Sequence, residues 1–138
     1  MKLEKLAHSI ARRAHSGQTR RDGTPYIVHP ERVAVRLIRR WREVTDEILA
    51  AAYLHNVLED TSESPDSLRA AGIPDRVIQI VETLTRRDGV SYEEYLARIR
   101  EYPLATAVKV EDMLDNLADD PSHKQIRKYA AGLLFLVP

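Results

Sequence analysis

The spacing of apolar residues is the feature that most constrains the fold of this chain. Apolar side chains recur at intervals of three and four along nearly the whole length, and strict alternation is almost nowhere seen. Intervals of three and four place side chains on one face of an α-helix, whereas a half-buried strand would alternate. The first such stripe consists of Leu3, Leu6, Ala7, Ile10, Ala11 and Ala14. The pattern predicts an all-α protein.

Helix start signals divide the rest of the chain into short elements separated by turns. Further helices are expected to open at Pro30, Thr45, Ser64, Pro74, Ser91, Pro103 and Ser122. SYEE at residues 91–94 has the capping-box pattern, a serine followed three residues later by a glutamate. GQTRRDGTPY, after the first helix, has two glycines and a proline and reads as a loop. We predict one helical bundle of about seven or eight helices over residues 1–138.

Composition excludes several classes of function. Lysine plus arginine number 21, as do aspartate plus glutamate, so the net charge is zero and no global field favours nucleic acid or an anionic membrane. The chain has no cysteine, which excludes disulfides and thiolate metal sites. Its N-terminus is charged, unlike a signal peptide, and no apolar stretch approaches the roughly 20 residues of a membrane span. We expect a soluble cytoplasmic domain.

Two predicted helices carry polar groups on a face that begins as apolar. In the helix from Thr45, one face holds Ile48, Ala52, His55 and Glu59. In the helix from Pro103, one face holds Ala105, Val108, Asp112 and Asn116. A buried carboxylate without a partner costs several kcal/mol, so such groups are usually paired or bound to a metal.

These polar residues have a structural interpretation and a functional one. A lone histidine on an apolar face is more often a hydrogen-bonded core residue, and an aspartate can simply pair with an arginine. The same anomaly on two helices, with His29 supplying another imidazole, favours a shared site. His29, His55 and Asp112 suit manganese, iron or zinc, whereas magnesium and calcium prefer oxygen ligands. They lie far apart in sequence, so only tertiary folding can bring them together.

Three segments of the chain resemble successive signatures of the HD-type phosphohydrolases. They are AHSGQTRRDGTPYIVHP (residues 14–30), LHNVLEDT (54–61) and VKVEDMLDNL (108–117). More narrowly, they resemble the hydrolase domain of the RelA/SpoT enzymes and the small alarmone hydrolases. Residues 84–105 look like a bacterial branch of single-domain HD proteins whose substrates are less defined. The resemblance implies an all-helical HD domain that removes pyrophosphate from the 3′ position of guanosine tetra- or pentaphosphate.

The resemblance also implies roles for individual residues. The ligands of one divalent ion, typically Mn²⁺, would be His29, His55, Asn56 and Asp112. Glu59 and Asp60 match the acidic pair that positions or deprotonates the attacking water. Arg20, Arg21 and Asn116 match residues on the substrate side, and the guanidinium fork of arginine suits phosphate oxygens. Without the surrounding motif, Arg20 and Arg21 would read as a solvated loop pair.

The chain departs from this pattern at position 56. The family signature there is His-Asp, whereas this sequence has His55 followed by Asn56. Asparagine keeps a carbonyl oxygen but carries no charge, so the ion would be held less tightly. Asn56 could coordinate weakly or orient a neighbouring carboxylate. It could also mark an engineered inactivation, or a lapsed enzyme, which leaves a nucleotide-binding HD module without turnover as the alternative function.

Two further features bear on substrate and assembly. Asp115 stands where alarmone hydrolases commonly have an uncharged or aromatic residue, and a carboxylate beside a nucleotide pocket would disfavour phosphates unless it were paired. The apolar residues 133–137 fit either the core or the face of a homo-oligomer. A helical interaction domain without any ligand is the third interpretation, and the paired polar anomalies disfavour it.

Overall fold

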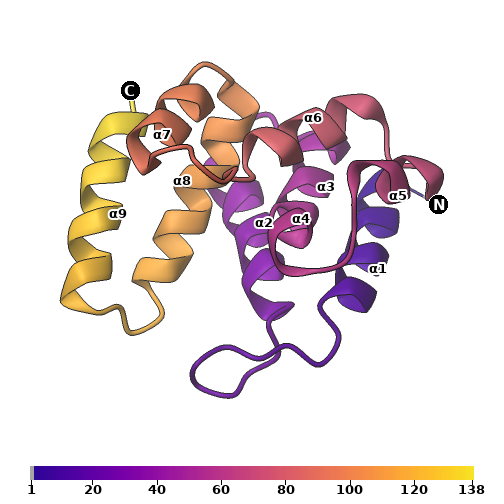
Figure 1. Ribbon diagram of the computed structural model, residues 1–138, viewed down its shortest axis with the longest axis horizontal. Coiled ribbons are helices and arrows are strands. Elements are labelled where there is room, and N and C mark those ends of the chain that lie inside the picture. The colour runs from indigo at the N-terminus through magenta and orange to yellow at the C-terminus, as the bar shows by residue number, and fades with distance from the viewer. Residues whose placement is uncertain (1) are drawn as a thin grey trace.

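The computed structural model of the chain describes residues 2–138, in which every regular element is an α-helix (Figure 1). The helices are α1 (Leu3–Ala14), α2 (Val28–Arg40), α3 (Asp46–Leu54), α4 (Val57–Asp60), α5 (Pro65–Ala70), α6 (Asp75–Thr83), α7 (Tyr92–Arg100), α8 (Pro103–Leu117) and α9 (His123–Leu136). The predicted all-α fold is confirmed. Without the four-residue α4, the helices in the described residues number eight, which lies within the predicted range.

Side-chain caps begin the helices where the sequence indicated. Thr45 accepts a hydrogen bond from the Ile48 amide at the start of α3, and Ser91 accepts one from the Glu94 amide at the start of α7. Ser122 forms a complete capping box with Gln125 at the start of α9. Each cap satisfies a backbone donor that has no partner within the helix.

The second helix begins earlier than predicted. We expected Pro30 to open it, but α2 starts at Val28, and Pro30 lies within the first turn. Proline is tolerated there because the amide groups of the first turn have no intrahelical acceptor. The earlier start places His29 on the helix itself, where its side chain is buried.

The prediction of one continuous helix from Thr45 to Glu59 was wrong. Helix α3 ends at Leu54, and a second, short helix, α4, begins at Val57. At the break, the His55 imidazole donates its Nδ1 hydrogen to the Ala52 carbonyl at 2.6 Å, while Asn56 adopts φ −110° and ψ 0°. The side chain thereby satisfies a carbonyl that a continuing helix would have used.

The centre of the bundle is α3, which contacts α1, α2, α6 and α8. Residues 50–52 are consecutive buried alanines, and such small side chains let the surrounding helices approach closely. Helix α8 contacts α2 on one side and α7 and α9 on the other, and Figure 1 shows α8 and α9 as a helical pair. The start of α2 lies beside the end of α3 and the second half of α8, and the polar residues gather there.

The apolar C-terminal segment is neither wholly core nor wholly exposed. Leu136 is buried, whereas Leu134 and Val137 are 85% and 50% exposed. No helix in residues 2–138 combines the length and the apolar character needed to cross a membrane.

Candidate metal centre

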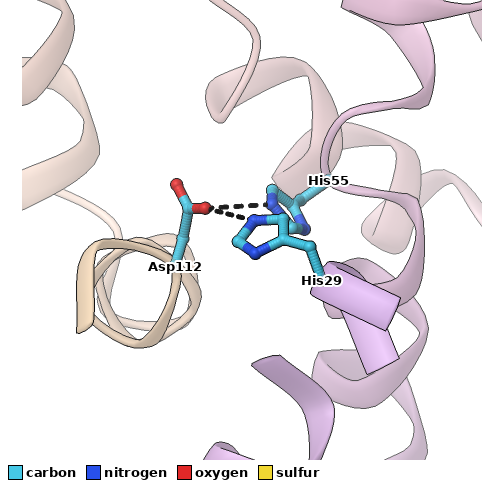
Figure 2. Close-up of side chains that lie close together, drawn as sticks. All are labelled: His29, His55 and Asp112. Carbon is cyan, nitrogen blue, oxygen red and sulfur yellow. Dashed lines mark hydrogen bonds and ion pairs between the residues drawn. The ribbon is translucent and has the colours of Figure 1, made fainter. Parts of the chain in front are cut away.

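Three helices bring His29, His55 and Asp112 together (Figure 2). One potential ligand atom from each lies within 4.8 Å of the others, and all three residues are buried. His29 Nε2 lies 2.7 Å from Asp112 Oδ1, and His55 Nε2 lies 3.4 Å from the same oxygen. His29 comes from the first turn of α2, His55 from the end of α3, and Asp112 from the middle of α8. The predicted convergence of these residues is present in the structure.

The hydrogen bonds around the two imidazoles direct their Nε2 atoms inward. His55 donates from Nδ1 to Ala52, so its Nε2 carries the lone pair, and this buried atom has no hydrogen-bond partner among residues 2–138. His29 Nδ1 lies 2.7 Å from Asp115 Oδ2. Neutral imidazole and carboxylate are the donors that first-row divalent ions accept. An unpartnered buried nitrogen beside a second imidazole and a carboxylate fits a site for a divalent metal.

Neighbouring side chains stabilise the ionised form of Asp112. Lys109, one turn earlier on α8, donates from Nζ to Asp112 Oδ2 at 2.9 Å. Burial raises the pKa of Asp112, but the Lys109 charge, the hydrogen bond from His29 and the neighbouring His55 imidazole outweigh burial and lower the pKa well below its usual range. Burial likewise lowers the pKa of Lys109, and the Asp112 carboxylate outweighs that effect and raises it. The carboxylate is therefore ionised at neutral pH.

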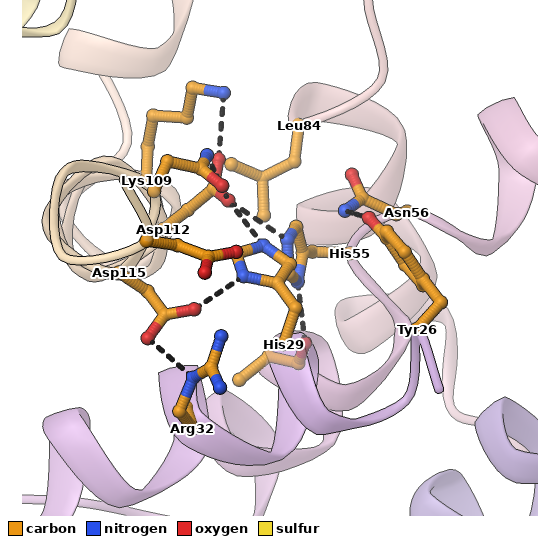
Figure 3. A network of polar contacts seen from close by, with 12 residues as sticks. Tyr26, His29, Arg32, His55, Asn56, Leu84, Lys109, Asp112 and Asp115 are labelled. Atoms are coloured by element: carbon orange, nitrogen blue, oxygen red, sulfur yellow. Dashed lines mark hydrogen bonds and ion pairs between the residues drawn. The ribbon is translucent and has the colours of Figure 1, made fainter. Parts of the chain in front are cut away.

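Asn56 lies at the edge of this cluster. Its amide donates to the Tyr26 hydroxyl, and Figure 3 shows this pair on the opposite side of His55 from Asp112. Burial, with the nearby Asp112 and Asp60 charges, raises the pKa of Tyr26, so the phenol stays neutral. Asn56 also lines the cavity into which His29 and Asp112 open.

The cavity beside the cluster has a volume of about 690 Å³ and is lined by side chains of both charges. The basic ones are Arg20, Arg21, Lys109 and Lys128, and the acidic ones are Asp22, Asp60, Asp112, Asp119 and Asp120. Because the signs are mixed, a charged ligand would be held by individual contacts and not by a uniform field.

The loop between α1 and α2 carries the two arginines predicted on the substrate side. A tight turn joins the Gly23 amide to the Arg20 carbonyl at 2.9 Å, and Gly23 has φ +87°, which glycine adopts without strain. Arg20 donates to Asp119 at 2.7 Å and to Asn116 at 3.2 Å, so the loop is fixed against the end of α8. Arg21 is more exposed and donates to Gln125 at 3.1 Å. All of these side chains line the cavity.

Asn116 links the arginine to the metal cluster. Its amide nitrogen lies 3.3 Å from Asp112 Oδ1, and its carbonyl oxygen accepts from Arg20. Asn116 is one turn beyond Asp112 on α8, as its spacing in the sequence predicted.

The structure separates the two residues of the predicted acidic pair. Asp60 lines the cavity, and its backbone carbonyl accepts a hydrogen bond from Gln18. Glu59 is exposed, and its Oε1 accepts from the Arg86 amide at 2.6 Å. The break after Leu54 explains this difference, because Glu59 no longer follows His55 by one turn of a single helix.

Asp115 is not among the residues that line the cavity, and its carboxylate is paired. Its side chain is 1% exposed and accepts from Arg32 Nε at 2.9 Å in addition to facing His29 (Figure 3). Burial raises the pKa of Asp115, but the hydrogen bonds from His29 and Arg32 outweigh it and bring the pKa to about 2. Burial lowers the pKa of His29, but its hydrogen bonds to Asp112 and Asp115 outweigh burial and raise the pKa above its ordinary value.

Sequence reasoning missed the part played by Lys109 and misplaced Asp115. Both lie three residues from Asp112 on the same helix, at positions 109 and 115. Residues three apart on a helix share a face, so the spacing alone could have placed both beside the carboxylate. Tyr26 was considered as a pocket residue, and it lines the cavity.

Together, the fold and the site define an all-α domain with a candidate divalent-metal centre of two imidazoles and one carboxylate. The sequence profile of the HD domain family matches residues 7–131. The chain belongs to the HD domain family.

Comparison with known proteins places guanosine polyphosphate enzymes among its relatives. The chain is 34% identical over 119 residues to a guanosine-3′,5′-bis(diphosphate) 3′-pyrophosphohydrolase of Aquifex aeolicus, a match that covers 80% of the chain and 17% of the relative. It is 33% identical over 123 residues to the bifunctional (p)ppGpp synthase/hydrolase SpoT of Escherichia coli K12, with 86% and 17% covered. The chain thus matches about a sixth of the length of these relatives.

A solved structure has the same fold. It is described as a metazoan ortholog of SpoT that hydrolyses ppGpp and plays a role in starvation responses. The TM-score is 0.80 at 25% identity, and the match covers 99% of this chain and 84% of the other.

Proposed function

We propose that this chain is a metal-dependent phosphohydrolase that removes the 3′-pyrophosphate group from guanosine tetra- or pentaphosphate. The observation that carries the proposal is the convergence of His29, His55 and Asp112 beside a cavity that also holds basic side chains. The relatives support the choice of substrate, because their names describe hydrolysis at this position.

The proposed metal is Mn²⁺, held by His29, His55 and Asp112, with Asn56 as a weak fourth ligand. A bound divalent ion would polarise the phosphate and lower the pKa of the attacking water. Within the chain, Ala52 and Asp115 orient the two imidazoles, and Lys109 keeps Asp112 ionised. Asp112 Oδ1 faces both imidazoles, while Lys109 contacts the other oxygen, Oδ2.

The proposed catalytic acids are Asp60 and Glu59. Asp60 lines the cavity, so its carboxylate can accept a proton from a water that attacks a phosphate bound there. Glu59 would have to leave the Arg86 amide to reach the same water. The two residues therefore make separable contributions under this proposal.

Arg20, Arg21 and Asn116 are proposed to bind the substrate. Arg20 is already oriented by Asp119 and Asn116, so little side-chain freedom is lost when it contacts a phosphate. Arg21 stands nearer to solvent, and a single hydrogen bond to Gln125 holds it.

The proposal covers the organisation of the protein as well as its chemistry. Residues 1–138 act as one HD domain in the cytoplasm, and the partner is a small nucleotide and not a nucleic acid. Exposed apolar side chains such as Leu134 leave a surface for association into a homo-oligomer.

The test is a hydrolysis assay with guanosine tetraphosphate and Mn²⁺, in which guanosine diphosphate and pyrophosphate are separated by anion exchange. We expect equal amounts of both products, no turnover with EDTA, and loss of turnover in His55→Ala. His123→Ala, at the exposed start of α9, serves as the matched control because it removes an imidazole that is not among the cavity-lining residues.

The possible outcomes separate the candidate functions. Full activity in His55→Ala would refute the proposed centre. Binding of the nucleotide without turnover, in both the wild type and Asn56→Asp, would identify a non-catalytic HD module instead. Turnover of other phosphate esters but not of guanosine tetraphosphate would keep the reaction class and change the substrate.

A further inference from the structure

The two imidazoles of the candidate metal centre are oriented by different acceptors. His55 Nδ1 faces a backbone carbonyl, that of Ala52, at 2.6 Å. His29 Nδ1 faces a carboxylate, that of Asp115, at 2.7 Å, and both partners are buried. A carboxylate carries a full charge where a carbonyl carries only a dipole, so the environments of the two histidines are electrostatically unequal.

The arginines of α2 fix the Asp115 carboxylate in place. Arg32 Nε and Arg36 Nε lie 2.9 Å and 3.3 Å from Oδ1, which leaves Oδ2 for His29. Figure 3 shows Asp115 between Arg32 and His29. With one oxygen committed to the arginines, the other accepts the Nδ1 hydrogen, so Nε2, which lies 2.7 Å from Asp112 Oδ1, is the nitrogen that would exchange its hydrogen for a metal ion.

We propose that Asp115 is a positioning residue for the metal ligand His29, and that it increases the metal affinity of a site in which Asp112 is the only carboxylate ligand. The inference rests on the proposed function, because it assumes a metal ion at the centre. A carboxylate that accepts from a ligating imidazole fixes its tautomer and raises its basicity as a ligand. The neutral amide of Asn56 cannot supply this negative charge.

A purely structural role for Asp115 would be to tie α8 to α2. Glu111 has that role one turn earlier, since its Oε2 accepts from Arg40 at 3.0 Å and from Trp41 at 3.1 Å. Glu111 is also fully buried, and its hydrogen bonds in the described part of the chain go to Arg40 and Trp41 and not to a histidine. It therefore provides a matched control for loss of a buried carboxylate between the same two helices.

The decisive measurement is the affinity for Mn²⁺ of Asp115→Asn and Glu111→Gln, determined by calorimetric titration of the metal-free protein. In Asp115→Asn, the arginines would attract the amide oxygen and turn the NH₂ group toward His29, which favours the wrong tautomer. We expect Mn²⁺ affinity to fall about 10- to 100-fold in Asp115→Asn and to stay within about 3-fold of wild type in Glu111→Gln. At saturating Mn²⁺, the nucleotide KM of Asp115→Asn should equal that of the wild type.

Two results would overturn the inference. Equal losses of affinity in both variants would show that Asp115 acts only through the packing of α8 on α2, and unchanged affinity in Asp115→Asn would show that it does not act on the metal site. A wild-type protein that binds no Mn²⁺ would instead refute the proposed metal centre itself.

A second measurement needs no variant and covers the case in which Asp115→Asn does not fold. Nitrogen-15 spectra of the Zn²⁺-loaded wild-type protein report which ring nitrogen of each histidine carries hydrogen. We expect His29 to be protonated at Nδ1, and protonation at Nε2 would overturn the inference.

Discussion

Replacing Lys109 by methionine should destabilise the metal-free protein and increase its affinity for Mn²⁺. Lys109 Nζ lies 2.9 Å from Asp112 Oδ2, and their side chains are 14% and 6% exposed. Removing one partner of a buried ion pair typically costs about 3–5 kcal/mol. Because both residues line a cavity of about 690 Å³ that water can enter, we expect a smaller loss, about 2 kcal/mol, in the free energy of unfolding.

The expected gain in Mn²⁺ affinity also follows from the removal of the Lys109 charge. In the metal-free variant, Asp112 has lost its nearest cation and keeps the contact with His29 Nε2 at 2.7 Å. A divalent ion restores that compensation, so the metal-bound state is destabilised less than the metal-free state. A difference of about 2 kcal/mol corresponds to Mn²⁺ binding that is about 30-fold tighter. Turnover should nevertheless fall, because Lys109 also lines the cavity proposed to bind the substrate.

Urea unfolding in EDTA and calorimetric titration with Mn²⁺ measure the two effects. Lys128→Met is the control for both, because Lys128 lines the same cavity but places its Nζ over the Tyr92 ring, 4.5 Å from its centroid. We expect Lys128→Met to leave metal affinity near the wild-type value. Unchanged or weaker Mn²⁺ binding in Lys109→Met would refute the argument that Lys109 and the metal neutralise the same carboxylate.

Three more perturbations follow from the described contacts. Asn56→Asp should bind Mn²⁺ on the order of tenfold tighter and hydrolyse faster, because it adds an anion at the edge of the cavity, and unchanged titrations would exclude position 56 from the site. The pKa of Asp115 is about 2 in the folded protein, against 3.8 for a free aspartate, so the ionised carboxylate stabilises the fold by about 2 kcal/mol above pH 3.8. This stabilisation is lost as the pH falls toward about 2. The unfolding curves of the metal-free wild type and of Asp115→Asn should therefore converge in acid. Arg20→Gln should lower kcat/KM about tenfold or more, and Arg21→Gln less, because Arg20 is held by two hydrogen bonds inside the cavity, and equal losses in steady-state assays would contradict this ranking.

Much of the fold was predictable because its determinants are local. Helix periodicity and capping residues act within a few positions, so Thr45 and Ser122 indicated helix starts that the structure confirms. The break between α3 and α4 was not predictable from the same signals. It depends on a side-chain bond from His55 to the backbone, and the apolar spacing through Glu59 gave no sign of it.

For the candidate site, the sequence indicated which residues would meet but not how each is held. His29, His55 and Asp112 could be grouped because their chemistry is complementary, and the structure brings them within 4.8 Å. The partners that orient them come from helix crossings: α2 meets α8 where Arg32 reaches Asp115. Such contacts depend on the angle and register of two helices, which no local pattern encodes.

The position of Asp115 changes how the departure at Asn56 is interpreted. Judged from sequence, an asparagine at position 56 removes a negative charge from the metal site, and Asp115 adds one where it would repel phosphate. The structure places the Asp115 carboxylate behind His29, buried and paired with Arg32, and Asp115 does not line the cavity. The two departures then have opposite effects on metal affinity: Asn56 removes a negative charge from the site, whereas Asp115 makes His29 a stronger ligand. A double-mutant cycle between positions 56 and 115 should therefore be non-additive in Mn²⁺ affinity, with Asp115→Asn costing less once Asn56→Asp is present.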